Sequence, residues 1–530
     1  MSEQSTSAPL DTIREGYAVQ GPSLDLGAAV WDGTPDASVQ VRLPLGVLSR
    51  HGLVAGATGT GKTKTLQVLA EQLSAQGVPV FLADIKGDLS GMASAGESSD
   101  KLTERAATVG QTWQGTAYPV QFLSLGGLGE GVPIRATVTS FGPTLLSKVL
   151  GLNDTQESSL GLVFHFADKH GLPLLDLKDL RAVVQYLTSD EGKADLKALG
   201  GLSTSTAGVI LRELVAFADK GADVFFGEPE FDTADLLTVG DDGRGVVSCL
   251  ELPAVQDRPE VFSTFLMWLL ADLFHDLPEV GDPDKPKLVF FLDEAHLLFD
   301  DASKAFLDSI EQTVRLIRSK GVGVFFVTQS PKDLPDSVLG QLGNRVQHAL
   351  RAFTPDDAKA LKATVSTFPR SDYDLGELLT QLGTGEAVVT VLSERGAPTP
   401  VAWTRMRAPQ SLMAPSPAET IDASIKASPL SAKYSEPLDR ESAYEKLQAR
   451  LEQAPAEDAT TGAAQEAGGS GAAAPASTTS KQPRRTTAEE KSTVEKVLES
   501  KAFHSALRSA GTVIGREITR SLFGTARRRR

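Results

Sequence analysis

An α/β fold with a mainly parallel sheet is predicted by three features of the sequence. The stretch Gly56–Thr63 fits the phosphate-binding pattern G-x-x-x-x-G-K-S/T. Short apolar runs that are typical of buried strands alternate with segments of helical spacing. One such run, Lys287–Leu292, is followed directly by the acids Asp293 and Glu294. Strands that alternate with helices usually pair in parallel, so their carboxyl ends should meet at one edge of the sheet.

The stretch Gly56–Thr63 is expected to form a P-loop. Its glycines allow a tight turn in which several backbone N–H groups point at phosphate oxygens. Lys62 supplies a positive charge for the β- and γ-phosphates, and the Thr63 hydroxyl is a ligand for Mg²⁺. An apolar strand precedes the loop and a helical pattern follows it, so the phosphates would lie at a helix N-terminus, where the dipole favours anions. The predicted nucleotide contacts are Gly56, Ala57, Thr58, Gly59, Thr60, Gly61, Lys62, Thr63 and Thr65.

The rest of the chain supplies further strand and helix signals. Besides the strand before the P-loop, strands are predicted at Val39–Val47, Gly77–Asp84, Val120–Leu125, Gly245–Leu250, Gly323–Thr328 and Gln347–Ala352. A closing hairpin is predicted at Ala387–Leu392 and Thr399–Arg405. Helices are predicted at Val261–Phe274 and Lys304–Ser319, and one more at Glu441–Gln453. Residues 1 to about 24 are expected to be mobile.

Six segments follow from these signals. They are an N-terminal lead-in (1–45), the first half of the ATPase core (46–141), a helical insertion (142–240), the second half of the core (241–408), a low-complexity linker (409–480) and a basic C-terminal helix (481–530).

The composition is that of an acidic globular protein. The 530 residues carry a net charge of −16, which argues against a surface that coats nucleic acid but does not exclude a ring with a local basic channel. Cys249 is the only cysteine, which excludes an intramolecular disulfide and fits a reducing compartment. The first ten residues lack the apolar core of a signal peptide, and the longest apolar stretches are shorter than a bilayer span. We therefore expect a cytoplasmic protein without a transmembrane segment.

The C-terminal end differs from the body in charge. From Lys481 to Arg530 there are 13 basic and 5 acidic side chains, a net of +8. Val494–Phe523 has a helix-forming composition, whereas Ala454–Lys481 is low in complexity and expected to be disordered. The basic helix could be a solvated helix with a charged tail. It could instead contact an anionic membrane, DNA or the acidic body of another subunit.

Acids after the strand Lys287–Leu292 supply the second half of the predicted site. Asp293 is placed to hold Mg²⁺ through water, and Glu294 to orient the water that attacks the γ-phosphate. A kinase acting on a small molecule would not usually need the second acid, so the pair favours ATP hydrolysis coupled to motion. Gln329 follows the next buried strand, where its amide can hydrogen-bond the γ-phosphate or the attacking water.

An arginine from a neighbouring subunit would complete such a site in a ring ATPase, because phosphoryl transfer requires charge neutralisation at the γ-phosphate. Arg345 is the first candidate, because it comes after the predicted strand Gly323–Thr328 and the loop that begins at Gln329. The other candidates are Arg315, Arg318 and Arg351. The predicted catalytic residues are thus Lys62, Glu294, Gln329 and Arg345, and the predicted metal-binding residues are Thr63 and Asp293.

Five short motifs suggest a family. They are Arg50–Leu53, Asp84–Leu89, Phe225–Pro229, Leu292–His296 and Val327–Pro331. Together they resemble the bacterial HerA-like ATPases of the HerA/FtsK superfamily over about residues 45–410, and conjugative coupling ATPases of the TraG type also carry an Asp-x-Lys-Gly stretch. The resemblance implies a RecA-like core, hexamers, Mg²⁺-dependent ATP hydrolysis and DNA translocation. It also implies that Lys62, Thr63, Asp293, Glu294 and Gln329 belong to the site.

Two functions are weighed. The first is a Mg²⁺-dependent, ATP-hydrolysing ring motor, a homo-oligomer that acts on DNA as a helicase or translocase. The second is an ATP-switched scaffold or membrane-associated assembly ATPase that does not translocate DNA. The basic C-terminal segment motivates the second function. The effect of DNA on ATP hydrolysis would distinguish them.

Overall fold

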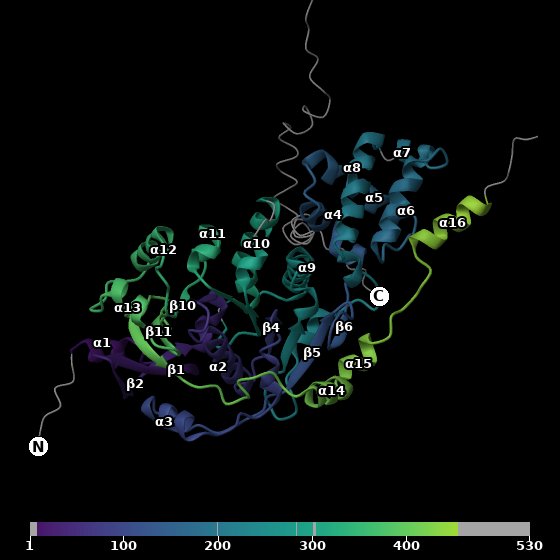
Figure 1. Cartoon of the computed structure of the whole chain (residues 1–530). Coiled ribbons are helices and arrows are strands. Elements are labelled where there is room, and N and C mark those ends of the chain that lie inside the picture. The colour runs from purple at the N-terminus through teal and green to yellow at the C-terminus, as the bar shows by residue number, and fades with distance from the viewer. Residues whose placement is uncertain (1–7, 199, 282, 300–303, 454–530) are drawn as a thin grey trace, which may run out of the picture.

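The computed structural model describes residues 8–453 except 199, 282 and 300–303 (Figure 1). Within these residues, twelve strands form one sheet. In spatial order they are β2 (Thr34–Pro44), β1 (Ser23–Trp31), β12 (Ala402–Met406), β11 (Glu386–Thr390), β10 (Asn344–Gln347), β3 (Gly52–Ala55), β9 (Val322–Thr328), β8 (Leu288–Leu292), β4 (Val80–Asp84), β7 (Val247–Glu251), β5 (Val120–Leu125) and β6 (Val132–Ile134).

The sheet has a parallel part and an antiparallel part. The neighbouring strands from β10 to β6 all pair in parallel. From β10 through β11, β12 and β1 to β2, each pairing is antiparallel. The predicted mainly parallel sheet and the closing hairpin are therefore confirmed. The strand predicted at Gln347–Ala352 is misplaced: β10 ends at Gln347, because the chain then turns toward the P-loop, where the Ala349 carbonyl accepts a hydrogen bond from the Ala57 N–H (2.8 Å).

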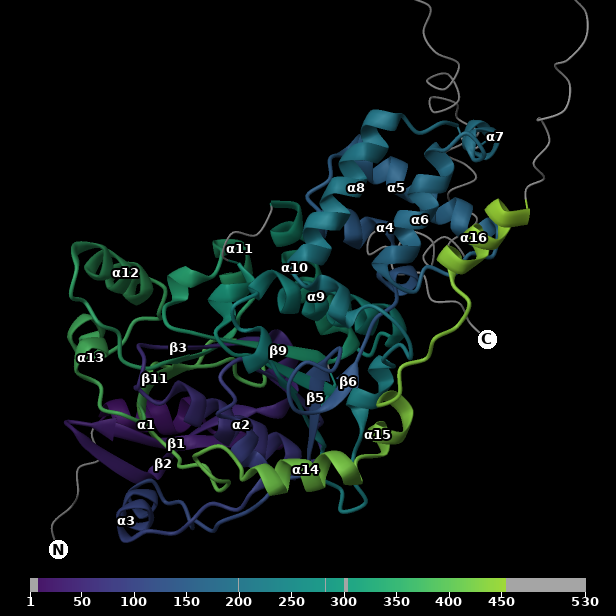
Figure 2. The ribbon, with the colours of Figure 1, turned by 45° about the vertical axis from the view of Figure 1, so that its right-hand side comes forward.

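Two apolar cores cover the two faces of the sheet. Alternate residues of β4 show the division: Phe81 packs in one core with α9 (Pro259–Asp276) and α10 (Lys304–Ile317). Leu82 packs in the other core with α1 (Ala8–Gly16) and α2 (Lys62–Ala75). Figure 2 shows α9 and α10 on one side of the sheet and α2 on the other. The helix that follows the P-loop is thus packed directly against the parallel strands.

Shorter helices lie in the connections from β4 to β5, from β9 to β10 and from β10 to β11. They are α3 (Asp100–Thr108), α11 (Asp336–Leu339), α12 (Pro355–Ser366) and α13 (Leu375–Gln381). A third, smaller apolar cluster joins α13 to β11 through Leu379 and Val388.

The N-terminal residues are ordered from residue 8, so the expectation of a mobile stretch up to about residue 24 is wrong. The side chains of Ile13 and Tyr17 are buried in the core. The Tyr17 hydroxyl lies 2.9 Å from the carbonyl oxygens of both Val389 and Pro400. Burial of α1 and pairing of β1 with β12 explain the order, and neither contact is visible in the local sequence.

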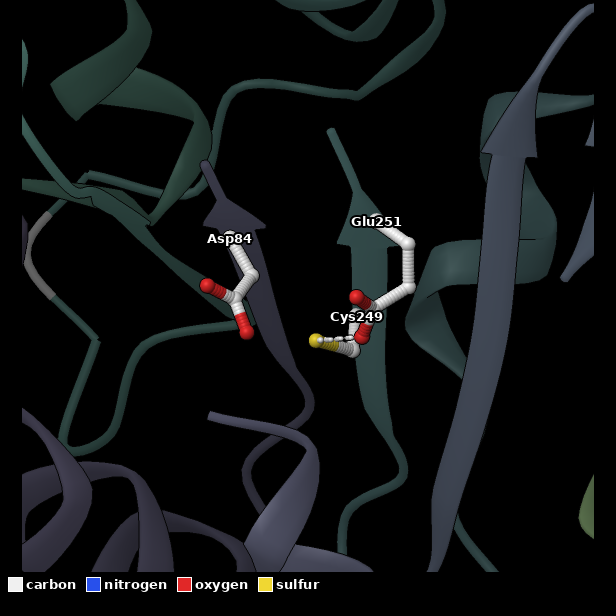
Figure 3. Close-up of side chains that lie close together, drawn as sticks. All are labelled: Asp84, Cys249 and Glu251. Atoms are coloured by element: carbon white, nitrogen blue, oxygen red, sulfur yellow. Dashed lines mark hydrogen bonds between the residues drawn. The ribbon is translucent and has the colours of Figure 1, made fainter. Parts of the chain in front are cut away.

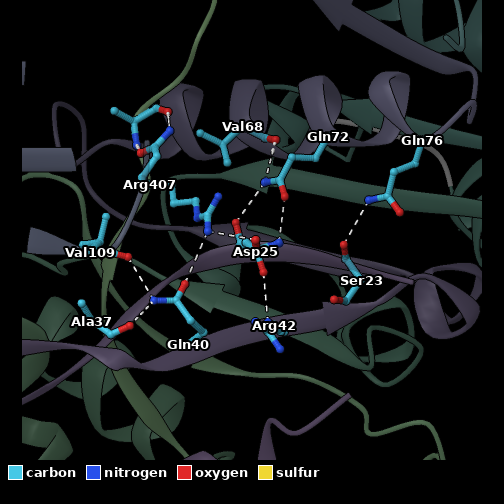
Figure 4. Close-up of polar contacts among 12 residues, drawn as sticks. Ser23, Asp25, Ala37, Gln40, Arg42, Val68, Gln72, Gln76, Val109 and Arg407 are labelled. Carbon is cyan, nitrogen blue, oxygen red and sulfur yellow. Dashed lines mark hydrogen bonds and ion pairs between the residues drawn. The ribbon is translucent and has the colours of Figure 1, made fainter. Parts of the chain in front are cut away.

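The hairpin β1–β2 is also tied to α2 by side-chain hydrogen bonds (Figure 4). The Gln72 amide accepts from the Asp25 N–H (2.8 Å) and donates to the Asp25 carbonyl (2.9 Å). Gln76 donates to the Ser23 carbonyl (3.0 Å), and Arg407 pairs with the Asp25 carboxylate (2.9 Å). These contacts fix the antiparallel extension against the helix that begins at the P-loop.

A helical insertion lies between β6 and β7, where the sequence predicted it, and in Figure 1 it projects away from the sheet. The side chain of Asn153 caps one of its helices in a capping box with Gln156. The helices described there are α4 (Val138–Val149), α5 (Asp154–Lys169), α6 (Leu177–Thr188), α7 (Lys193–Ala198) and α8 (Thr204–Asp219).

Residues 409–453 form an ordered segment, which we call the C-terminal strap, and not the beginning of a linker as predicted. The strap first contacts α2, where the buried Glu71 carboxylate accepts the N–H groups of Gln410 and Ser411 (both 2.9 Å). Its far end reaches the helical insertion, where the Tyr444 N–H donates to Asp179 (3.0 Å). These partners lie hundreds of residues away in sequence, so composition alone suggested a linker.

The strap contains three helices. They are α14 (Ala418–Ala427), α15 (Pro429–Tyr434) and α16 (Ala443–Gln453). The last matches the helix predicted at Glu441–Gln453. The low-complexity stretch Ala454–Lys481 and the basic helix of residues 481–530 lie outside the described residues. In the described part of the chain, no helix combines the length and apolar character that a bilayer span requires.

Candidate functional site

The carboxyl ends of four neighbouring parallel strands place the predicted site residues at one edge of the sheet. Ala55 at the end of β3 pairs with Thr328 at the end of β9. Leu292 at the end of β8 pairs with Phe326, two residues before the end of β9, and with Ala83, one residue before the end of β4. The P-loop, Gln329, the two acids and the loop after β4 therefore lie side by side, in that order.

The P-loop connects β3 to α2. Gly56, Gly59 and Gly61 have φ values of 155°, 78° and 113°, which side chains rarely tolerate. A Cβ atom at Gly56 would lie only 2.5 Å from the Cβ of His348. The remaining loop residues are Ala57, Thr58 and Thr60, and α2 begins at Lys62 with Thr63 and Thr65 in its first turn. The loop thus ends at a helix N-terminus, as an anion site requires.

The ammonium group of Lys62 points back into the P-loop. Its Nζ donates to the carbonyl oxygens of Gly56 (2.6 Å) and Ala57 (3.2 Å). Burial lowers the pKa of Lys62, and the nearby carboxylates of Glu294 and Asp293 oppose that effect. The lysine is therefore held inside the loop, close to the acids of β8.

A residue that the sequence did not reveal, His348, supports the P-loop from behind. Its Nε2 lies 2.9 Å from the Thr65 hydroxyl, and its Nδ1 lies 2.8 Å from the Glu386 carbonyl. Burial lowers the pKa of His348 to about 4, so the ring is neutral near pH 7. The Thr65 hydroxyl is thus engaged with His348, and the Thr65 N–H donates to the Gly61 carbonyl (2.9 Å), so its predicted nucleotide contact stays a prediction.

The two acids after β8 differ in their surroundings. Asp293 accepts the Glu294 N–H through Oδ1 (2.9 Å), while its buried Oδ2 has no hydrogen-bond partner among the described residues. Burial and then the charge of Glu294 raise the pKa of Asp293 to about 7. A bound cation would favour its charged form. The orphaned oxygen is the observation that fits the predicted Mg²⁺ role of Asp293.

Glu294 adopts a left-handed backbone conformation (φ 44°, ψ 46°), which is uncommon for a residue with a side chain. Its Oε1 forms an ion pair with the ammonium of Lys86, in the loop after β4. Burial acts to raise the pKa of Glu294, but the hydrogen bond and charge of Lys86 outweigh it, so that pKa is lowered. Lys86 is a second residue that sequence reasoning did not assign to the site.

The loop that carries Lys86 is fixed by a buried acid, Asp84 (Figure 3). The Asp84 carboxylate accepts the N–H groups of Gly87 and Leu89 (both 2.8 Å). Next to it on β7, the Cys249 thiol donates to Glu251 (3.4 Å). Burial raises the pKa of Asp84 to about 6 and that of Glu251 to about 8, with the charge of Asp84 adding to the latter. Asp84 thus shapes the loop through its backbone amides.

Gln329 and Arg345 have different positions relative to the edge. Gln329 is exposed directly after β9, beside the P-loop, where its prediction requires it. Arg345 lies within β10 and pairs with Leu53, two residues before the end of β3. Its guanidinium donates to the Thr367 hydroxyl (2.9 Å) in a cavity of about 350 Å³ between α11 and α12. The structure therefore does not bring Arg345 to the P-loop of its own chain, and its role in a neighbouring subunit stays a prediction.

The residues present fit ATP and Mg²⁺. The P-loop offers backbone donors at a helix N-terminus with Lys62 beside them. Thr63 in the first turn of α2 and the orphaned oxygen of Asp293 are oxygen ligands of the kind that Mg²⁺ prefers.

Comparisons with known proteins agree with this geometry. Residues 31–530 match the family described as "Helicase HerA-like C-terminal". The chain is 22% identical over 359 residues to "DNA double-strand break repair helicase HerA" of Sulfolobus acidocaldarius, covering 67% of this chain and 64% of that protein. It is 25% identical over 363 residues to "Probable helicase MJECL08" of Methanocaldococcus jannaschii, covering 64% and 63% of the two chains. The match thus spans less than two thirds of the length of each relative.

A solved structure shows the same fold. The bacterial conjugative coupling protein TrwB, without its first 70 residues and unbound, superposes with a TM-score of 0.50 at 15% identity, covering 77% of this chain and 95% of that one. The RecA-like P-loop core expected from the sequence is therefore confirmed. The chain belongs to the HerA-like helicase C-terminal family.

Proposed function

We propose that this chain is the ATP-hydrolysing subunit of a homo-oligomeric motor that acts on DNA. One observation supports the hydrolytic part: Asp293 and Glu294 follow β8, which only the single strand β9 separates from β3 and its P-loop. In this proposal the P-loop cradles the phosphates, and a carboxylate from the end of β8 orients the water at the same phosphoryl group.

Each residue has a role in this proposal. Lys62 and the P-loop amides bind and orient the β- and γ-phosphates, and Thr63 and Asp293 would hold the Mg²⁺, which supplies charge neutralisation when bound. Glu294 orients the attacking water. Gln329, exposed at the adjacent strand end, reports whether the γ-phosphate is present. An arginine of a neighbouring subunit, with Arg345 as the first candidate, completes the site, which is why we propose a ring and expect a hexamer.

The DNA part rests on family membership. Relatives of the chain are named as helicases, one of them in DNA double-strand break repair. Acidic surface charge requires that any DNA contact be local, within an assembled ring. The cytoplasmic location stays a prediction.

The test measures ATP turnover with and without duplex DNA at low salt, where phosphate contacts are strongest. We expect a severalfold stimulation that disappears as salt is raised, together with a mass that corresponds to a closed oligomer. The Glu294→Gln protein serves as the control for contaminating ATPase. Turnover that DNA leaves unchanged at low salt would remove the motor proposal while leaving ATP hydrolysis intact.

The alternative, an ATP-switched scaffold or membrane-associated ATPase, is favoured by the net charge of +8 in residues 481–530, which lie outside the described part of the chain. The full chain should then bind vesicles with anionic lipid more tightly than duplex DNA. Tighter binding to DNA would support the motor.

A further inference from the structure

The ion pair between Lys86 and Glu294 joins two neighbouring strand ends that are far apart in sequence. Lys86 lies in the loop after β4, and Glu294 follows β8, 208 residues later. The loop is held by Asp84, whose carboxylate accepts the N–H of Lys86 itself (3.2 Å) as well as those of Gly87 and Leu89. The backbone that carries Lys86 is therefore fixed at the edge where the phosphates would lie.

The contact is not an ordinary surface ion pair. The Glu294 side chain is only 7% exposed, whereas that of Lys86 is 49% exposed. Exposed pairs contribute little, but a buried carboxylate that loses its partner is left with an uncompensated charge. Lys86 therefore decides how the Glu294 carboxylate can be oriented.

The two oxygens of Glu294 are used differently. Oε1 is bound by Lys86, while Oε2 has no hydrogen-bond partner among the described residues. The Nδ1 of His296 lies 3.4 Å from Oε2 without hydrogen-bond geometry. Oε1 is thus held by Lys86, and Oε2 is a buried acceptor whose hydrogen-bonding capacity is unused among the described residues.

We propose that Lys86 is the positioning residue for Glu294: by holding Oε1 it directs Oε2 at the water that attacks the γ-phosphate. The inference rests on ATP hydrolysis at this site but not on DNA as the substrate. Lys86 acts on the reaction through Glu294 and binds no nucleotide oxygen itself.

The experiment measures ATP turnover of the full chain without DNA for Lys86→Met and Lys86→Arg, alongside the affinity of each for a fluorescent, non-hydrolysable ATP analogue. Misplacement of a reacting group by about 1 Å costs on the order of 100-fold in rate. We expect kcat of Lys86→Met to fall by roughly 10- to 100-fold, with KM and analogue affinity changed by no more than about twofold. Lys86→Arg should recover part of kcat, because it keeps the charge.

Lys359 provides a matched control, because it forms an exposed ion pair with Asp356 (2.9 Å) on α12. Lys359→Met should leave kcat unchanged. A kcat that is unchanged or raised in Lys86→Met would overturn the positioning role. A loss of analogue affinity in parallel with kcat would also overturn it, since Lys86 would then bind the nucleotide directly.

A double variant tests the route of the effect. Adding Lys86→Met to Glu294→Gln should produce no further loss in single-turnover rate, because the group through which Lys86 acts is already altered. A further loss as large as in the wild-type background would assign Lys86 to another step. A wild-type chain without ATP turnover would refute the proposed function, whereas an active wild type with an equally active Lys86→Met would refute only this inference.

Discussion

On the β3 side of the nucleotide site the P-loop takes its shape mostly from eight consecutive residues, Gly56–Thr63. On the β8 side the position of Glu294 depends on Lys86, which lies 208 residues away. The first side is determined by local backbone conformation, and the second by contact between separate loops. A motif can therefore indicate phosphate binding in the sequence, while the orientation of Glu294, the proposed water-orienting group, is set by the fold.

The largest expected effect is a loss of turnover on the β8 side of the site that leaves nucleotide binding on the β3 side intact. Glu294→Gln should lower kcat by about 100- to 10,000-fold, because a positioned acid–base group contributes on that order. Affinity for a non-hydrolysable ATP analogue should be retained, because the P-loop is untouched. Lys62→Ala is the contrasting variant and should lose analogue affinity as well as turnover. Steady-state kinetics and equilibrium binding measure both, and normal turnover in Glu294→Gln would contradict the assignment.

A smaller effect is expected where the P-loop does depend on a distant residue. Gly56→Ala would bring a Cβ to 2.5 Å from the Cβ of His348, at a φ of +155°. We expect a loss of about 1–3 kcal/mol in the free energy of unfolding, together with weaker analogue binding. Gly171→Ala is the control, because it also has positive φ (+61°) but no atom within 4 Å. Denaturant titration of the two variants gives the comparison, and equal losses would show that backbone strain alone matters.

The smallest effect concerns the acid cluster that supports the Lys86 loop. Burial and the charge of Asp84 raise the pKa of Glu251 from 4.5 to about 8. The folded protein then binds more protons than the unfolded chain between these values, so this group lowers stability as pH rises from about 4.5 to about 8. Glu251→Gln should remove the dependence and gain up to about 3 kcal/mol at pH 8 relative to pH 5. Urea unfolding at both pH values measures the free energy of unfolding of the wild type and the variant. The same pH dependence in both proteins would contradict the raised pKa of Glu251.

The sequence predicted the parts of the site that short motifs define. The P-loop, Asp293, Glu294 and the strand before Gln329 are where the pattern put them. These elements are readable because each combines a local apolar run with polar residues at its end.

Residues that act across the fold were not predictable in this way. Lys86 lies in the Asp-x-Lys-Gly stretch that carries part of the family resemblance, but nothing in that stretch names its partner, and His348 has no distinctive spacing. Their contacts with Glu294 and Thr65 depend on which strands become neighbours. Arg345 was placed by its order after β9, but register with β3 puts it inside the strand. The C-terminal strap was mistaken for a linker for the same reason, since Glu71 supplies its partner from α2.

The strap also has a consequence for how the protein is made. The hydrogen bond between Ser411 and Glu71 spans 340 residues, and that between Tyr17 and Pro400 spans 383. Contacts of such separation slow folding, because long loops must close before they gain stability. A growing chain that has passed the P-loop lacks the strap, which contacts Glu71 on α2, until residue 411 emerges. Until then the Glu71 carboxylate lacks the N–H groups of Gln410 and Ser411, so this part of α2 gains its final contacts only after all twelve strands of the described sheet have been synthesised.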